Sequence, residues 1–190
     1  SIAARENEAL RLAAENGHLG VVNKLLEYPA VVNNITADRN DALRCAARNG
    51  HLEVVKLLLE YQAVRNNITA YDNGALRSAA HYGHLDIVKV LLEYPVVVDD
   101  IATLNVVFRY AAWRGHLDVV KKLLEYPVVR EDIAARYNGA LRGAAESSHL
   151  EVVKVLLEYQ VVRNNITADR NLALRNAAGK GHHLVCYVIA

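Results

Sequence analysis

The sequence predicts an all-α protein built as a solenoid of stacked helix-turn-helix units. Three observations lead to this prediction. An Ala-Ala pair recurs along the chain in steps of 33, 33, 32, 33 and 33 residues. A Gly-His-Leu turn, or a close variant of it, follows each pair, and a Leu-Leu-Glu-Tyr segment returns in the same phase. A repeat of this length is too short to bury its apolar faces alone, so successive repeats must stack.

The first helix of each repeat is predicted from the spacing of its small apolar residues. In repeat two, residues 42–49, Leu43, Ala46 and Ala47 stand at i, i+3 and i+4, which places them on one helical face. The alanines allow neighbouring helices to approach closely. Gly50 follows directly, and a glycine at this point can adopt the left-handed conformation that ends a helix.

The second helix, at about residues 52–61 of repeat two, is apolar on nearly every side, so it is expected to lie between neighbouring layers. It should end at Tyr61 and its equivalents. Three of the five complete repeats have a proline at the next position, and proline pushes the preceding residue out of helical conformation. A long connection to the next repeat follows, and we expect it to be irregular.

The composition limits the classes of function. The chain has 190 residues, of which 53% are hydrophobic and 23% charged, with a formal net charge of +1, as in soluble folded proteins. No segment approaches the roughly 18–20 apolar residues of a membrane helix, and no signal peptide is visible. Cys45 and Cys186 are far apart, which favours free thiols in a reducing compartment. The near-neutral charge gives no reason to expect a nucleic-acid partner.

The motif ALRxAAxxGHLEVVKxLLE resembles the ankyrin repeat over essentially the whole chain. The resemblance implies one domain over residues 1–190, with five complete repeats of about 33 residues and a partial sixth from about residue 167. Two features depart from the family. Its Thr-Pro-Leu-His opening is absent, and proline or glutamine replaces the glycine that usually ends the second helix. We therefore do not expect the connections to form the family's regular hairpin fingers.

One histidine recurs at the start of every second helix, and it could belong to a metal array, a row of catalytic bases or the scaffold. Stacked layers repeat at about 8–10 Å, whereas the ligands of one zinc lie about 2 Å from it, so the histidines cannot share a metal. No nucleophile accompanies them. We predict that each one bonds backbone groups around its turn and across to the next repeat. They are His18, His51, His84, His116, His149 and His182.

An arginine also recurs, before the Ala-Ala pair of every repeat. Arginine suits planar contacts with phosphate, so this ladder could form a phosphate-binding stripe. Because it is unchanged in all six repeats, a structural role is the favoured interpretation. The ladder consists of Arg11, Arg44, Arg77, Arg109, Arg142 and Arg175.

Residues that differ between repeats are free to serve a partner, because stacking does not require them. Aromatic and arginine side chains, which are enriched at binding hot spots, gather at such positions in repeats three to five. The resemblance implies that these positions line a concave groove, and we expect one exposed patch there. The alternative is that the aromatic residues fill a packing gap. The predicted partner-binding residues are Tyr71, His81, Tyr82, Leu104, Tyr110, Trp113, Arg114, Arg136 and Tyr137.

The sequence therefore predicts a non-enzymatic protein-protein interaction module that acts as a cytoplasmic monomer. We expect no catalytic residue, cofactor, metal, nucleic acid or membrane as part of its function, because no nucleophile, phosphate cradle or ligand spacing is visible. The repeats resemble the variant ankyrin repeats of intracellular bacteria and large viruses, which would place a secreted effector in the host cytosol. The alternatives are a fragment of a larger effector or enzyme whose catalytic domain lies outside residues 1–190, and an engineered repeat scaffold.

Overall fold

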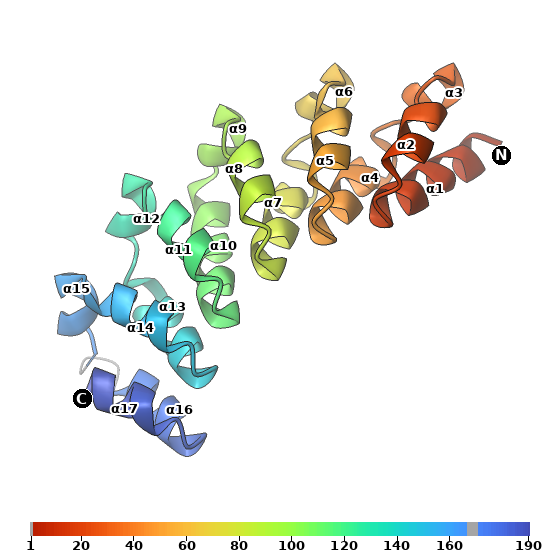
Figure 1. The fold of residues 1–190 in the computed structure, drawn as a ribbon. Helices are drawn as coiled ribbons and strands as arrows, with labels where there is room; N and C mark the ends of the chain where they lie inside the picture. Colours follow the sequence, from red (N-terminus) through yellow and green to blue (C-terminus); the bar gives the residue numbers. More distant parts are fainter. Residues whose placement is uncertain (1, 167–170) are drawn as a thin grey trace. The chain divides into compact units, whose positions relative to one another are not determined.

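The computed structural model describes residues 2–166 and 171–190, and the side chains from Asn7 onward except that of Tyr137 (Figure 1). Helices and turns make up this part of the chain, and no strand occurs in it. The predicted all-α repeat fold is confirmed. The chain divides into two compact halves, an N-terminal half, Ser1–Asp99, and a C-terminal half, Asp100–Ala190.

In each half, the first helices of successive repeats pack in one row and the second helices pack in another. The N-terminal half contains, in chain order, α1 (Ile2–Glu15), α2 (Leu19–Leu25), α3 (Pro29–Val32), α4 (Ala37–Arg48), α5 (Leu52–Leu59), α6 (Gln62–Asn66), α7 (Ala70–Tyr82), α8 (Leu85–Leu91) and α9 (Pro95–Val98). Its rows are α1, α4, α7 and α2, α5, α8.

The C-terminal half repeats this arrangement. It contains α10 (Ile101–Arg114), α11 (Leu117–Leu123), α12 (Pro127–Glu131), α13 (Ala135–Glu146), α14 (Leu150–Leu157), α15 (Gln160–Asn164), α16 (Leu172–Gly179) and α17 (His183–Ile189). Its rows are α10, α13, α16 and α11, α14, α17. The second helices lie between layers, as predicted, and Val55 and Leu58 of α5 are both 0% exposed.

The connections between repeats are more regular than predicted. Each complete repeat has a third, short helix directly after the second, where the sequence analysis expected irregular chain. The prolines that end the second helices are also the first residues of α3, α9 and α12. Proline suits this position because its fixed backbone angle is already helical and its missing N–H would have no partner there. The expected absence of hairpin fingers is confirmed in the residues that the structure describes.

A left-handed turn lies within the first residues of α4 and α7, and the regular part of each helix follows it. In repeat two, Asp38, Arg39 and Asn40 all have positive φ, and Tyr71, Asp72 and Asn73 repeat this conformation in repeat three. The last residue of each turn is a buried asparagine, and asparagine tolerates this conformation better than most residues. The Nδ2 of Asn40 donates to the carbonyl oxygens of Val64 at 3.0 Å and Asn67 at 2.7 Å.

Asn138 repeats this arrangement in the C-terminal half, where its Nδ2 donates to the carbonyl oxygen of Val162 at 3.1 Å. Asn40 and Asn138 thus fix the first helix of their repeat to the short third helix of the same repeat. The sequence analysis missed this ladder, although an asparagine stands at its position in every repeat: Asn7, Asn40, Asn73, Asn105, Asn138 and Asn171.

The histidines belong to the scaffold, as predicted. The Nε2 of His51 lies 3.0 Å from the carbonyl oxygen of Glu15, and His84 and His182 make the same contact with Arg48 and Glu146. Each ring donates to the end of the first helix in the preceding repeat, whereas the sequence analysis expected a contact with the next repeat. Gly17 ends α1 at φ 70°, and a Cβ at Gly17 would overlap the His51 ring. The glycine therefore both ends a helix and admits the next repeat's histidine.

His149 makes stability depend on pH. Burial lowers its pKa, and the nearby His116 lowers it further, against the effect of a hydrogen bond to the backbone of Trp113. The unfolded chain therefore takes up this proton near the ordinary histidine pKa of about 6.5, and the folded chain takes it up only at a lower pH. We expect stability to fall as the pH drops below about 6.5. Urea unfolding across this range should show a shallower pH dependence for His149→Gln, and an unchanged slope would contradict this role.

Candidate functional site

An open groove of about 440 Å³ lies between α10 and α13, within the C-terminal half. Both helices are first helices of their repeats, so the groove lies on the surface where the sequence analysis placed the partner. Its lining consists of Val106, Arg109, Tyr110, Trp113, Arg136, Gly139, Arg142, Gly143 and Glu146.

Two glycines of α13 make room for the groove. A Cβ on Gly139 would lie 3.0 Å from Cδ of Arg109, and one on Gly143 would lie 3.1 Å from Cβ of Trp113. Because these contacts are tighter than ordinary packing, the side chains of α10 can lie against α13 only where α13 has none. The glycines stand four residues apart and so share one helical face.

The aromatic residues of the groove lie partly in solvent. Tyr110 is 41% exposed and Trp113 is 40% exposed, so neither is a core residue. The Arg114 guanidinium stands 4.8 Å from the centre of the Trp113 ring, within the range of a cation–π interaction. A rigid, half-exposed indole with a guanidinium over its face is a surface that a partner side chain can cover at little entropic cost.

The groove has more positive than negative charge. Arg109, Arg136 and Arg142 line it, and its one lining carboxylate, on Glu146, pairs with Lys180 at 3.3 Å. Burial lowers the pKa of Arg109, and repulsion from Arg136 lowers it further, against the weaker opposite effect of Asp132. The positive charges of Arg109 and Arg136 are therefore only partly compensated within the protein.

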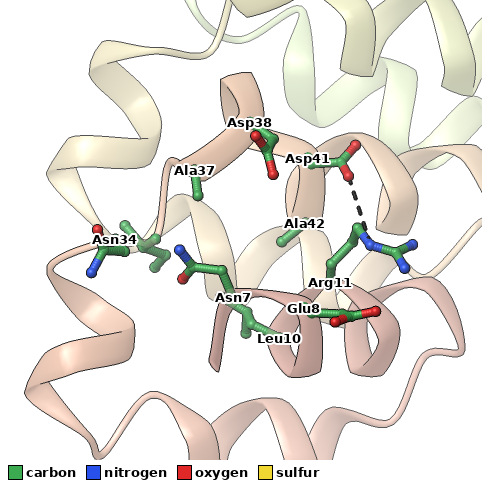
Figure 2. A pocket seen from close by; sticks show the side chains of 10 residues that line it. Asn7, Glu8, Leu10, Arg11, Asn34, Ala37, Asp38, Asp41 and Ala42 are labelled. Carbon is green, nitrogen blue, oxygen red and sulfur yellow. Dashed lines mark ion pairs between the residues drawn. The ribbon is translucent and has the colours of Figure 1, made fainter. Parts of the chain in front are cut away.

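The corresponding surface between α1 and α4 has a different character (Figure 2). A smaller pocket of about 260 Å³ lies there, lined by polar residues that include Glu8, Asp38 and Asp41. Arg11 crosses this pocket toward Asp41, with its Nε 3.9 Å from Oδ2. The two surfaces therefore share the ladder arginine and differ in the residues around it.

The predicted binding residues of repeat three, Tyr71, His81 and Tyr82, lie in the N-terminal half. Tyr71 is 55% exposed, and the guanidinium of Arg44 stands 4.7 Å from its ring centre. Tyr82 is 44% exposed and packs edge-on against His81, with ring centres 4.8 Å apart. That these residues share one patch with those of repeats four and five stays a prediction.

Leu104 is not a surface residue, so its assignment to the binding site is wrong. It is 0% exposed and lies within α10. Repeat four is one residue shorter here, and α10 begins directly after Asp100, whose Oδ1 accepts a hydrogen bond from the backbone N–H of Thr103 at 3.1 Å. No residue of α10 has a positive φ, so the left-handed turn of repeats two, three and five is replaced by regular helix. Leu104 therefore faces the core.

Arg114 and Arg136 are exposed, as predicted, while the side chain of Tyr137 lies outside the part that the structure describes. The sequence analysis missed Arg109, Arg142, Gly139 and Gly143 as groove residues. The glycines could have been noticed, because no other repeat has glycine at both of these positions.

The described ranges lack two other kinds of site. No group of three or more His, Cys, Asp or Glu residues is placed to hold a metal ion there. No helix in the same ranges has both the length and the apolar character needed to cross a membrane.

Comparisons with known proteins agree with this architecture. The family model described as "Ankyrin repeats (3 copies)" matches residues 7–102 and 108–190. A search of curated proteins gave no match. Among solved structures, the crystal structure of the human ASB11 ankyrin repeat domain superposes with a TM-score of 0.72 at 24% sequence identity, covering 95% of this chain and 81% of that one. At this identity the likeness concerns the fold alone.

Proposed function

The chain belongs to the ankyrin-repeat family, and we propose that it binds a partner protein through the groove between α10 and α13. Ankyrin repeats are generally protein-interaction modules without catalytic activity. In this proposal the scaffold positions of the repeats hold the stack together, and the positions that vary between repeats meet the partner.

The half-exposed Trp113 is the observation that best supports this proposal. It is the only tryptophan of the chain, and it stands where repeats one and five have Glu15 and Glu146. Stacking therefore does not require an aromatic residue at this position. A large aromatic side chain held at the surface costs solubility, and tryptophan is among the residues most enriched at hot spots. Tyr110 extends the same surface by one helical turn.

Replacing Trp113 by alanine tests the proposal. We expect the melting temperature to stay nearly unchanged, because the ring is 40% exposed and is not core. The affinity for a partner should fall by about 2 kcal/mol or more, which is about thirtyfold. Partners captured from a lysate with the wild-type chain would be purified, and each would be titrated against both proteins by calorimetry.

Tyr28→Ala provides a matched control. Tyr28 is 53% exposed, but it directly precedes α3 and is not among the residues that line the groove. Its removal should leave the affinity within about 0.5 kcal/mol of wild type. Equal losses in both variants, or a loss in neither, would mean that the partner uses another surface. Unfolding of Trp113→Ala would mean that the indole supports the fold.

A further inference from the structure

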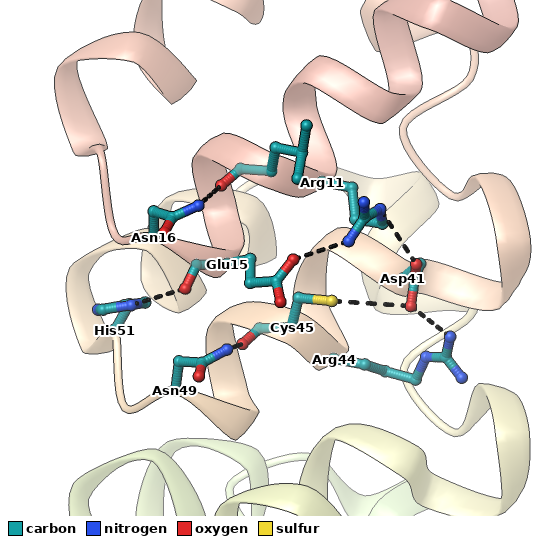
Figure 3. A network of polar contacts seen from close by, with 9 residues as sticks. Arg11, Glu15, Asn16, Asp41, Arg44, Cys45, Asn49 and His51 are labelled. Carbon is teal, nitrogen blue, oxygen red and sulfur yellow. Dashed lines mark hydrogen bonds and ion pairs between the residues drawn. The ribbon is translucent and has the colours of Figure 1, made fainter.

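The ladder arginines of the first two repeats are neutralised by carboxylates of the same chain (Figure 3). Arg11 pairs with Glu15, four residues later on α1, at 2.7 Å, and lies 3.9 Å from Asp41 on α4. Asp41 also pairs with Arg44 at 2.5 Å. Two carboxylates therefore serve two arginines: Arg11 has partners at i+4 and on the facing helix, and Arg44 has one at i−3.

None of the three corresponding positions around Arg109 has a carboxylate. Trp113 stands at i+4, Val106 stands at i−3, and Gly139 occupies the position of Asp41 on the facing helix. Within the part of the chain that the structure describes, the guanidinium of Arg109 forms no ion pair and no hydrogen bond. The carboxylate that acts on it, Asp132, already accepts a hydrogen bond from Nδ2 of Asn105 at 2.7 Å.

The pKa directions of the two arginines agree with this difference. Burial opposes the charge of Arg11, but its contacts with Cys45 and Glu15 outweigh burial and raise its pKa. For Arg109 the balance is reversed, because burial and the nearby Arg136 lower its pKa. A carboxylate arriving in the groove would thus improve the electrostatic environment of Arg109, whereas Arg11 already has its partners.

We propose that the groove between α10 and α13 binds an acidic peptide segment, whose side-chain carboxylate takes the place that Asp41 occupies between α1 and α4. This inference rests on the proposed function and names the chemistry of the partner. The missing side chains of Gly139 and Gly143 leave room for the segment, and Arg109, Arg136 and Arg142 surround it. Tyr110 and Trp113 cover an apolar residue beside the acidic one.

A carboxylate fits this place better than a phosphate because the chain itself uses carboxylates at the same positions. Asp41 and Glu15 show that the ladder geometry accepts a carboxylate as a direct partner of the guanidinium. A planar guanidinium also matches a carboxylate edge to edge. The net charge of +1 provides no broad basic surface for a nucleic acid, which would need many backbone contacts.

Trp113 provides a reporter within the groove, because the chain has no other tryptophan. The wild-type chain would be titrated with a short, end-blocked peptide of glutamate, glycine and leucine while tryptophan emission is recorded. The same peptide with glutamine in place of glutamate is the charge control. We expect a saturable change with the glutamate peptide, weakened by added salt because the attraction is electrostatic, and at least about tenfold weaker binding of the glutamine peptide.

Two variants test whether the carboxylate of the peptide binds Arg109. Arg109→Gln removes the positive partner, and Gly139→Asp restores an internal carboxylate at the position of Asp41. Each should weaken binding of the glutamate peptide by about tenfold or more. A Cβ at Gly139 would lie 3.0 Å from Cδ of the flexible Arg109 side chain and 3.7 Å from Cβ of Arg136, which is an ordinary contact, so Gly139→Asp should fold. Arg11→Gln removes a ladder arginine that already has its carboxylates, and it should leave the affinity unchanged.

Several results would overturn the inference. Equal binding of the glutamate and glutamine peptides would show that the groove does not recognise charge. Tighter binding of a phosphoserine version, by about tenfold or more, would make the groove a phosphopeptide site instead. Wild-type affinity in folded Gly139→Asp would also contradict the assignment. Trp113→Ala could weaken the binding of a protein partner while Gly139→Asp leaves that binding unchanged. In that case the proposed function stands, and the proposal of an acidic ligand is wrong. If neither variant affects that partner, the groove itself is the wrong surface.

Discussion

Replacing Leu58 by alanine should lower the free energy of unfolding by about 2–5 kcal/mol. Leu58 is 0% exposed in the middle of α5, which packs against both α2 and α8. Its truncation removes apolar contacts on both sides of the layer. The rigid neighbouring helices can collapse only partly into the cavity, and so the cost exceeds the transfer free energy of the lost atoms. Urea unfolding followed by circular dichroism would measure the difference.

The adjacent Leu57 provides the control for this prediction. It is only partly buried, and Lys24 and Lys122 occupy its position in repeats one and four. Leu57→Lys should therefore change the free energy of unfolding by about 1 kcal/mol or less. Similar losses in the two variants would mean that α5 is not packed between two layers in solution.

Asn40→Ala should cost about 2–5 kcal/mol, for two separate reasons. The variant removes the Nδ2 donor, which leaves the carbonyl oxygens of Val64 and Asn67 without that partner. It also places alanine at φ 59°, where the Cβ of an L-residue approaches the following carbonyl oxygen. Since Asn40 is only 2% exposed, water cannot readily replace the lost hydrogen bonds.

Asn40→Gly separates the two contributions. Glycine adopts positive φ freely, so this variant loses the hydrogen bonds but avoids the backbone strain. We expect it to be more stable than Asn40→Ala by about 1–2 kcal/mol, and still less stable than wild type. A loss below about 1 kcal/mol in Asn40→Ala would mean that the asparagine is not an anchor of the short helix α6.

Local features of the chain were predicted correctly because each depends on residues close together in sequence. The spacing of Leu43, Ala46 and Ala47 is that of one helical face, and Gly50 takes the left-handed conformation expected of it. The short third helices were missed because proline was interpreted only as the end of one helix, although it is equally suited to begin the next. That signal was present in the sequence.

Leu104 shows where comparison between repeats gave a wrong result. It differs from the residues at its position in other repeats, and this difference was taken as a sign of partner binding. One missing residue lets α10 run on as regular helix from Ile101, and this turns Leu104 into the core. A one-residue change in length rotates the following side chains by about 100° around a helix, since a turn has about 3.6 residues.

The sequence by itself determined the period, the two helices of each repeat and the histidines of the scaffold. It also identified Tyr110 and Trp113 as aromatic residues at positions that vary between repeats. The tertiary structure alone decided what surrounds them. Arg11 meets Asp41 and Arg109 faces Gly139 across 30 residues of chain, because stacking brings one repeat against the next. Open space and unneutralised charge depend on both helices that face each other, and neither helix determines them alone.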